Sequence, residues 1–445
     1  MTTRPLLLLL IAAITLASAG EPPPPRGAIQ QAGEMRDAPD AAPFIRYAAW
    51  LPEKLVPGKR YALVLALHGL HQNERSLLYY VSTLGFQRNG LVQEAIVLGI
   101  KSKGDGWADE DTPAIEHALA WALKTWPIDT DRVYGYAISN GAMRMGLFAP
   151  RHQDILAAAV LLSGNVRNLP PTPAGTEPDI GMYLMHGDAD PIVPVQEGRD
   201  AARDLAAAHY RLVYREYAGE KHIYAGTVQI VAQPDAVRWL FTQRLRHAPA
   251  TPAAAAALVE ARAAAQGAAG ATEAALAPLA ELAGKEVDAV LVQALAAAAA
   301  PKVRLAAARL CTTRLYGRPV LAALAPLATD KDAELRRTAI AALGLAANWQ
   351  QADALAALEA VAADAHGKDR AEATAQLGLA WPLQRLCSNQ DAALKGALEA
   401  LTADRDPSVH ELAAQGLAGT LVRDGLGVRI VPVAPGRGAQ PQPKK

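Results

Sequence analysis

Apolar runs alternate with amphipathic segments along the first half of the chain. A first mixed strand at 44–50 is followed by a continuous apolar run at 61–67, which is typical of a strand covered on both faces. Further strand patterns occupy 94–100, 132–138, 156–162, 182–185 and 212–217. Segments with helical periodicity lie between or after them, at 73–84, 112–125, 195–208 and 234–246. This alternation predicts an α/β fold, with a doubly wound, mostly parallel sheet covered by helices over residues 44–246.

The pattern changes after His247 to Ala- and Leu-rich helix with almost no strand signal. Residues 332–344 and 406–418 align without gaps, and weaker copies lie at 303–310 and 370–379. The irregular period of about 34 to 40 residues suits solenoids of paired helices. Units that open with Asp, followed by Leu-Arg or Val-His, resemble HEAT-type repeats. We therefore expect an all-α HEAT-like domain over residues 272–422.

The remaining segments are not expected to form a core. Arg4, the apolar run 6–16 and Ala17-Ser18-Ala19 have the layout of a secretory signal peptide over residues 1–19. Its apolar run is shorter than the roughly 20 residues that span a bilayer, so no membrane span is expected. Residues 20–43 read as a Pro/Ala-rich linker, 247–271 as an Ala-rich connector and 423–445 as a disordered tail, apart from a short apolar piece at 428–433. The layout predicts a secreted or periplasmic protein.

Composition narrows the function further. The chain has 44 Lys and Arg residues and 44 Asp and Glu residues, so no excess charge indicates a nucleic-acid partner. Cys311 and Cys387, the two cysteines, would lie about two repeats apart, beyond the roughly 7 Å Cα separation of a disulfide, so we expect two free, packed thiols. No His or Cys spacing indicates zinc, and we expect no metal and no cofactor.

The stretch that best indicates chemistry surrounds Ser139. The strand pattern stops at this serine, and helix-forming residues follow at once. Ala137 and Gly141 are the small flanking residues of a nucleophile elbow, in which a serine is held above the sheet on a sharp strand-to-helix turn. A helix beginning at Asn140 would also point backbone N–H groups at an oxyanion beside the serine. By itself the motif is common, and it favours a buried serine at a strand end.

A serine hydroxyl needs a base within hydrogen-bond reach and a carboxylate that orients the base. In a sheet of this kind both are expected downstream, in the order Ser, Asp, His. The loop after residues 182–185 contains His186-Gly-Asp188-Ala-Asp190, and the loop after 212–217 contains Gly219-Glu-Lys-His222. Asp188 and Asp190 are both candidates for the acid, and a histidine base predicts that activity falls on acidification.

Together with Leu67-His-Gly69 and Asp129-Thr-Asp-Arg-Val-Tyr134, these motifs resemble the α/β-hydrolase superfamily. The nearest branch is that of the secreted esterases, which includes polyhydroxybutyrate depolymerases, feruloyl esterases and phospholipase/carboxylesterases. The resemblance implies that Ser139 is the nucleophile, Asp190 the acid and His222 the base.

The same resemblance implies an oxyanion hole made by the backbone N–H groups of Asn140 and Leu70, with His71 as the alternative to Leu70. His71 and Trp107 are candidate substrate-pocket residues, although Trp107 equally suits a loop-anchoring role. His68 and His186, which precede glycines at strand ends, are expected to shape turns.

These observations predict an exported serine hydrolase that cleaves carboxylic esters through an acyl-enzyme. The resemblance implies feruloyl or acetyl esters of plant polysaccharide, or another polymeric ester, as substrates, with the repeats docking polymer or protein. Three alternatives remain: a serine peptidase of the prolyl-oligopeptidase type, an interaction protein with an inert hydrolase domain, and repeats that only stabilise the chain.

Overall fold

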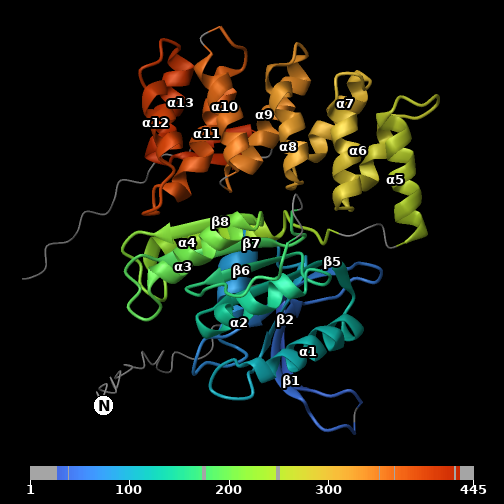
Figure 1. Cartoon of the computed structure of the whole chain (residues 1–445), viewed down its shortest axis with the longest axis vertical. Helices are drawn as coiled ribbons and strands as arrows, with labels where there is room; N and C mark the ends of the chain where they lie inside the picture. Colours follow the sequence, from blue (N-terminus) through green and yellow to red (C-terminus); the bar gives the residue numbers. More distant parts are fainter. Residues whose placement is uncertain are drawn as a thin grey trace, which may run out of the picture.

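A sheet with its covering helices forms the first part of the protein, and a row of helices forms the second (Figure 1). The computed structural model describes residues 28–38, 40–172, 177–246, 251–349, 351–364, 366–424 and 427–430. The predicted signal peptide therefore lies outside the described residues. The predicted order of an α/β domain followed by an all-α repeat domain is confirmed.

The sheet has eight strands in the order β1-β2-β4-β3-β5-β6-β7-β8. The strands are β1 (Ala28–Met35), β2 (Ile45–Pro52), β3 (Tyr61–Leu67), β4 (Ala95–Ile100), β5 (Ile128–Ile138), β6 (Ala158–Leu162), β7 (Gly181–Gly187) and β8 (Arg211–Tyr217). From β4 to β8 all neighbours are parallel, whereas β2 is antiparallel to both β1 and β4. The carboxyl ends of β3, β5, β7 and β8 therefore share one edge of the sheet.

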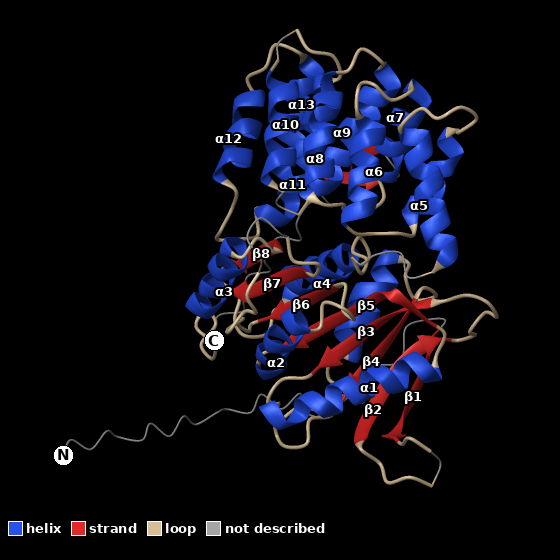
Figure 2. Cartoon of the chain, turned by 45° about the vertical axis from the view of Figure 1, so that its right-hand side comes forward, coloured by secondary structure: helices blue, strands red, loops and turns tan. Residues whose placement is uncertain are grey.

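Helices cover both faces of the sheet, as the continuous apolar runs predict (Figure 2). Leu63 and Leu65 pack into the core with α1 (Thr112–Thr125), α2 (Asn140–Phe148) and α3 (Val195–Ala207). Val64 and Ala66 point to the opposite face, which the π-helix η1 (Tyr79–Gln87) and α4 (Gly226–Leu240) cover. Successive residues of β3 thus bury against different helices, because side chains alternate along a strand.

Two predicted boundaries in this part are wrong. Residues 28–35, placed in the linker, form β1, which pairs along its whole length with β2 although Met35 is its one fully buried side chain. Main-chain pairing rather than an apolar pattern makes this edge strand. Helix α4 begins at Gly226 rather than at Pro234, which lies inside the helix, and the carbonyl of Pro234 accepts a 2.7 Å hydrogen bond from Asn89.

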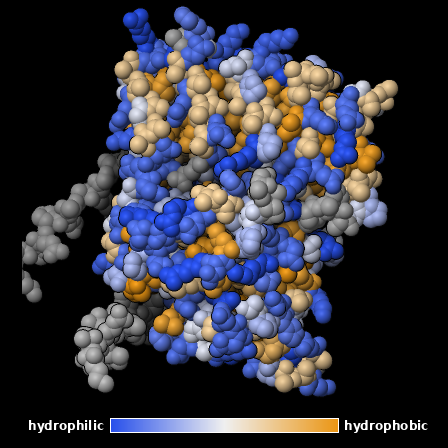
Figure 3. Space-filling model, in the orientation of Figure 1, coloured by the Kyte–Doolittle hydropathy of each residue, from blue (hydrophilic) through white to orange (hydrophobic). Residues whose placement is uncertain are grey.

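The second part consists of paired helices around one apolar core. Its elements are α5 (Pro252–Ala265), η4 (Glu273–Ala280), α6 (Lys285–Leu295), α7 (Pro301–Leu310), α8 (Arg318–Leu324), η5 (Ala325–Thr329), α9 (Ala333–Ala347), α10 (Ala352–Ala363), α11 (Arg370–Gln384), α12 (Ala392–Leu401) and α13 (Pro407–Ala418). In Figure 3 apolar residues show between neighbouring repeat helices, among hydrophilic ones. As expected, Asp332 and Asp406 begin equivalent helices, and each accepts backbone N–H groups of the first turn.

The ends of the repeat domain differ from the predicted ones. Helix α5 lies in the predicted connector, yet Leu258 and Ala261 belong to the repeat core, so the packed helices begin about 20 residues before residue 272. At the other end, β9 (Leu421–Asp424) pairs with β10 (Gly427–Ile430), which begins one residue before the apolar piece excepted from the predicted tail. Residues 431–445 lie outside the described residues.

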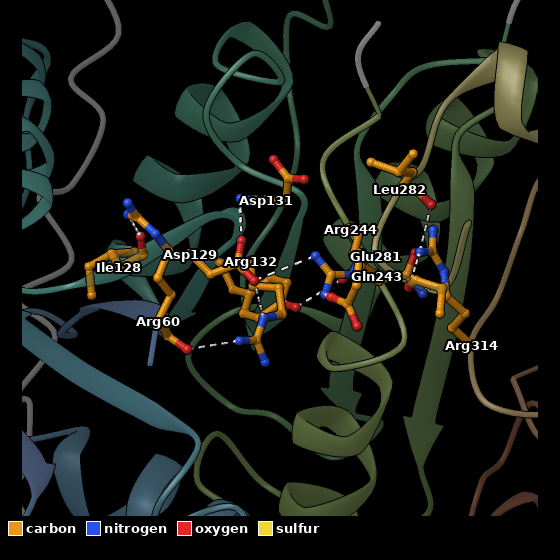
Figure 4. Close-up of polar contacts among 12 residues, drawn as sticks. Arg60, Ile128, Asp129, Asp131, Arg132, Gln243, Arg244, Glu281, Leu282 and Arg314 are labelled. Carbon is orange, nitrogen blue, oxygen red and sulfur yellow. Dashed lines mark hydrogen bonds and ion pairs between the residues drawn. The ribbon is translucent and has the colours of Figure 1, made fainter. Parts of the chain in front are cut away.

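The two parts share a continuous core. Leu345, Trp349 and Cys387 of the repeats pack in one apolar cluster with the sheet face that α4 covers. Polar contacts continue the interface beside β5, where Arg244 pairs with Asp129 of the sheet and with Glu281 of the repeats (Figure 4). The repeats are therefore not a separately tethered module.

Both thiols are free and buried, as predicted. Burial raises the pKa of Cys311 to about 12 and that of Cys387 to about 11. Both side chains therefore stay protonated and pack as small apolar groups. Within the described ranges no helix is both long and apolar enough to cross a membrane.

Candidate active site

Ser139 lies on a sharp turn between β5 and α2, as the sequence predicts. Its backbone has φ 55° and ψ −124°, a strained conformation that a side chain rarely adopts. Its N–H donates to the carbonyl of Leu162 at 2.8 Å, which ties the turn to β6. A Cβ atom at Gly141 would lie 2.3 Å from the Leu67 carbonyl oxygen, so only glycine fits there, whereas the methyl of Ala137 is fully buried without displacing the turn.

Asp190 and His222 meet although they lie on different loops. The Nδ1 atom of His222 donates to Oδ2 of Asp190 at 2.8 Å, and the other carboxylate oxygen accepts from the N–H groups of Ile192 and Val193. The side chain of Asp190 is fully buried and that of His222 is 12% exposed. Burial raises the pKa of Asp190, but the hydrogen bonds from His186, His222 and the backbone outweigh it and hold that pKa well below its usual range. Asp190 is therefore a carboxylate wherever the protein is folded near neutral pH.

The competing acid, Asp188, has a different partner. Its Oδ1 atom accepts the N–H of Gly219 at 2.7 Å, at the start of the loop that carries His222. The geometry thus pairs His222 with Asp190 and gives Asp188 a turn-capping contact. Both loops are also joined through the main chain, since the Ala189 N–H donates to the Glu220 carbonyl at 3.0 Å.

The two histidines expected to shape turns do so. Nδ1 of His68 donates to the Gly69 carbonyl at 2.7 Å, and Nε2 accepts from the Ser102 N–H at 3.1 Å, which requires the neutral ring. Burial lowers the pKa of His68, in agreement with that state. The ring of His186 donates through Nε2 to the Val193 carbonyl at 2.9 Å and lies 3.5 Å from Asp190, so it braces the acid loop.

The loop after β3 passes close to Ser139. A Cβ atom at Gly69 would lie 3.4 Å from the Cβ atom of Ser139. Leu70 follows and its side chain is 46% exposed. His71 has a positive φ of 58°, and its N–H donates to the Asp105 carbonyl at 2.7 Å. The N–H of His71 is thus already used, which leaves Leu70 as the better candidate for an oxyanion donor beside Asn140.

Trp107 connects this loop to the serine turn. Its indole N–H donates to the His68 carbonyl at 2.9 Å, and its backbone N–H donates to the side-chain oxygen of Asn140 at 2.5 Å. The indole is buried and contacts the His68 ring. These contacts match the loop-anchoring role of Trp107. The exposed imidazole of His71 lies 3.7 Å from the Asp105 carboxylate.

Sequence reasoning missed Ser163. This fully buried residue follows β6 with a φ of 48°, and its hydroxyl donates to the carbonyl of His222 at 3.0 Å. This hydrogen bond therefore helps to hold the backbone of His222 in place. A serine after an apolar run is common, and nothing in the sequence signals this contact.

Comparisons with known proteins give one family match and several similar solved structures. A family model described as HEAT repeats matches residues 289–378, within the predicted span of 272–422. A search of curated protein sequences finds no match.

Among solved structures, the chain is similar to a thermostable esterase at 21% identity and a TM-score of 0.39, covering 48% of this chain and 63% of that one. The Bacillus cereus carboxylesterase matches at 19% identity and a TM-score of 0.34, over 44% of this chain and 93% of that one. A ferulic acid esterase from Anaeromyces mucronatus matches at 15% identity and a TM-score of 0.38, over 48% and 91%. The chain thus spans less than two thirds of the thermostable esterase. The strand order of the sheet is that of the α/β-hydrolase fold, and residues 289–378 match HEAT repeats.

Proposed function

We propose that this protein is a serine hydrolase that cleaves carboxylic esters. The observation that carries the proposal is the 2.8 Å hydrogen bond from His222 to the buried carboxylate of Asp190, at the sheet edge where Ser139 follows β5. A carboxylate on Nδ1 leaves Nε2 of the imidazole unprotonated, which is the form that a general base needs. The same buried carboxylate stabilises the imidazolium once it forms.

The reaction then follows from these groups. The Ser139 hydroxyl attacks the ester carbonyl and passes its proton to His222. The backbone N–H groups of Asn140 and Leu70 hold the oxyanion of the tetrahedral intermediate. His222 returns the proton to the leaving alcohol, which leaves an acyl-enzyme on Ser139. Water, activated by His222, then releases the acid.

Exposed apolar side chains favour an apolar acyl group. Leu70, Ile192 and Ile223 are 46%, 62% and 40% exposed, and each lies within two residues of, or is itself, a proposed catalytic position. Large apolar side chains left in solvent beside a site commonly receive an apolar ligand. An aryl or alkyl acyl group, including a feruloyl group, suits these three apolar side chains better than a charged acyl group. Export through the segment 1–19 is part of the proposal.

A fluorophosphonate probe combined with a substrate panel tests the proposal. The intact protein should be labelled and Ser139→Ala should not, and nitrophenyl esters should be turned over faster than aminoacyl nitroanilides. Faster turnover of the amides would instead favour a peptidase of the prolyl-oligopeptidase type. No labelling of the folded protein would favour an interaction protein with an inert hydrolase domain.

A further inference from the structure

The outer edge of β8 is covered by the repeats. The Ser388 N–H donates to the Glu216 carbonyl at 2.6 Å, and the Ala218 N–H donates to the Leu386 carbonyl at 3.0 Å. Between these bonds Tyr217 and Cys387 form an antiparallel bridge. The turn after α11 thus adds a short strand to the edge of the sheet. Figure 1 shows β8 as the strand that lies nearest to the repeat helices.

Two side chains continue this pairing beyond the main-chain bonds. Asn389 accepts the Glu216 N–H at 3.0 Å through Oδ1 and donates to the Tyr214 carbonyl at 3.1 Å through Nδ2. The hydroxyl of Ser388 lies 3.1 Å from the Glu216 carbonyl and 2.8 Å from its carboxylate. The amide of Asn389 therefore imitates the peptide group of a neighbouring strand. An edge strand otherwise leaves its outward-facing backbone N–H and C=O groups without a strand partner.

The covered edge leads directly to the proposed base. Strand β8 ends at Tyr217, and His222 follows in the loop that begins at Ala218. On its inner side this loop is held by Asp188 and Ala189, and at His222 by Ser163. On its outer side, the bond from Ala218 to the repeats holds its first residue. A displacement of β8 would therefore move the imidazole relative to Ser139, and a shift of about 1 Å at a reacting group can cost about 100-fold in rate.

We propose that Ser388 and Asn389 are positioning residues for the hydrolysis. They fix the outer edge of β8 and so hold the His222 loop where proton transfer from Ser139 needs it. The inference rests on the proposed function. It makes the repeats part of the catalytic unit, in contrast to a docking module that could be removed without effect on small substrates.

The test compares the double variant Ser388→Ala/Asn389→Ala with a matched variant of the same interface. Glu281→Gln weakens the contact with Arg244, which pairs with Asp129 of β5 (Figure 4). With 4-nitrophenyl acetate, the double variant should lose about tenfold or more in kcat at nearly unchanged KM. Glu281→Gln should keep the wild-type kcat.

Each outcome decides for or against the inference. Wild-type kcat in the double variant, or an equal loss in Glu281→Gln, would overturn it, since a purely structural contact changes stability without changing the kcat of the folded protein. If the double variant does not fold, amide hydrogen exchange is measured on the wild-type protein in place of the kinetic comparison. The N–H groups of Glu216 and Ala218 should then exchange as slowly as those of β7, and rapid exchange would overturn the inference. Undiminished turnover by Ser139→Ala would instead refute the proposed function, so the two failures differ.

Discussion

Replacing Arg215 with methionine should lower the thermal stability of both parts of the chain together. Arg215 lies on β8 and its side chain is fully buried. It donates to the Asn348 carbonyl of the repeats at 2.7 Å and to the Tyr183 hydroxyl at 3.1 Å, and it lies 3.7 Å from the buried carboxylate of Asp235. Methionine keeps most of the volume, but it removes the positive charge and all three contacts.

The magnitude follows from these contacts. Removing one partner of a buried ion pair costs about 3–5 kcal/mol. We expect about 3 kcal/mol, since Asp235 keeps hydrogen bonds from Tyr183 and Trp349 and an ion pair with Arg238 at 3.2 Å. An unfolding entropy of about 2.1 cal/mol/K per residue gives about 0.8 kcal/mol/K for about 400 residues that unfold as one unit, hence a fall in Tm of about 4 °C. A sheet domain of about 200 residues that unfolds alone would shift by about 7 °C.

Differential scanning calorimetry of the wild-type protein, Arg215→Met and Arg238→Met distinguishes these cases. Arg238 pairs with the same carboxylate but is 53% exposed, so its replacement should cost less than about 1 kcal/mol. We expect one transition that Arg215→Met moves as a whole. Two separate transitions in the wild-type protein would refute the reasoning that the shared core joins both parts. Equal shifts for the two variants would refute the larger cost assigned to the buried arginine.

Three further predictions concern the site and its surroundings. Asp190→Asn removes the charge behind the imidazole and should lower kcat by roughly 10³–10⁴-fold in steady-state assays, and a loss below tenfold would contradict the assigned acid. Hydrogen bonds from Arg199 lower the pKa of Glu216, burial raises it, and hydrogen bonds from Ser388 and Tyr214 lower it further. Together they hold this pKa at about 2. Because this pKa is below that of the unfolded chain, ionised Glu216 stabilises the fold above about pH 4.5, and this contribution is lost as pH falls towards 2. The difference in Tm between wild type and Glu216→Gln should therefore shrink between pH 7 and pH 3, and a constant difference would speak against it. Ile192→Ser should lower kcat/KM more for nitrophenyl octanoate than for the acetate, while Val259→Ser on α5, 65% exposed, should change neither.

Where the sequence carries a strong local pattern, the structure follows it closely. The predicted helix at 112–125 and the strand at 61–67 have the observed bounds, because Pro113 and the apolar periodicity fix the first and a continuous apolar run fixes the second. The serine turn at residue 139 is equally local, since a small residue must follow at Gly141. The pairing of His222 with Asp190 depends on the sheet topology, which brings two distant loops together. It was therefore predicted from the family resemblance and not from a local pattern.

Features made by distant pairing had no sequence signal. Strand β1 is exposed along most of its length and forms because its main chain pairs with the edge of β2. The cover over β8 comes from residues 386–389, a turn between helices with no strand pattern of its own. A hydrophobic pattern depends on residues that are close together in the sequence. These contacts join distant segments that meet only once the sheet and the repeats have packed.

The covered edge also has a consequence for biosynthesis. Ser388 lies 172 residues after its partner Glu216 in the chain. Because a ribosome makes about 5–20 residues per second from the amino end, β8 emerges on the order of 10 s before the segment that covers it. During that interval the nascent sheet presents an open strand, which readily pairs with a strand of another chain. Pairing between two newly made chains therefore competes with the native cover until the last repeats have been synthesised.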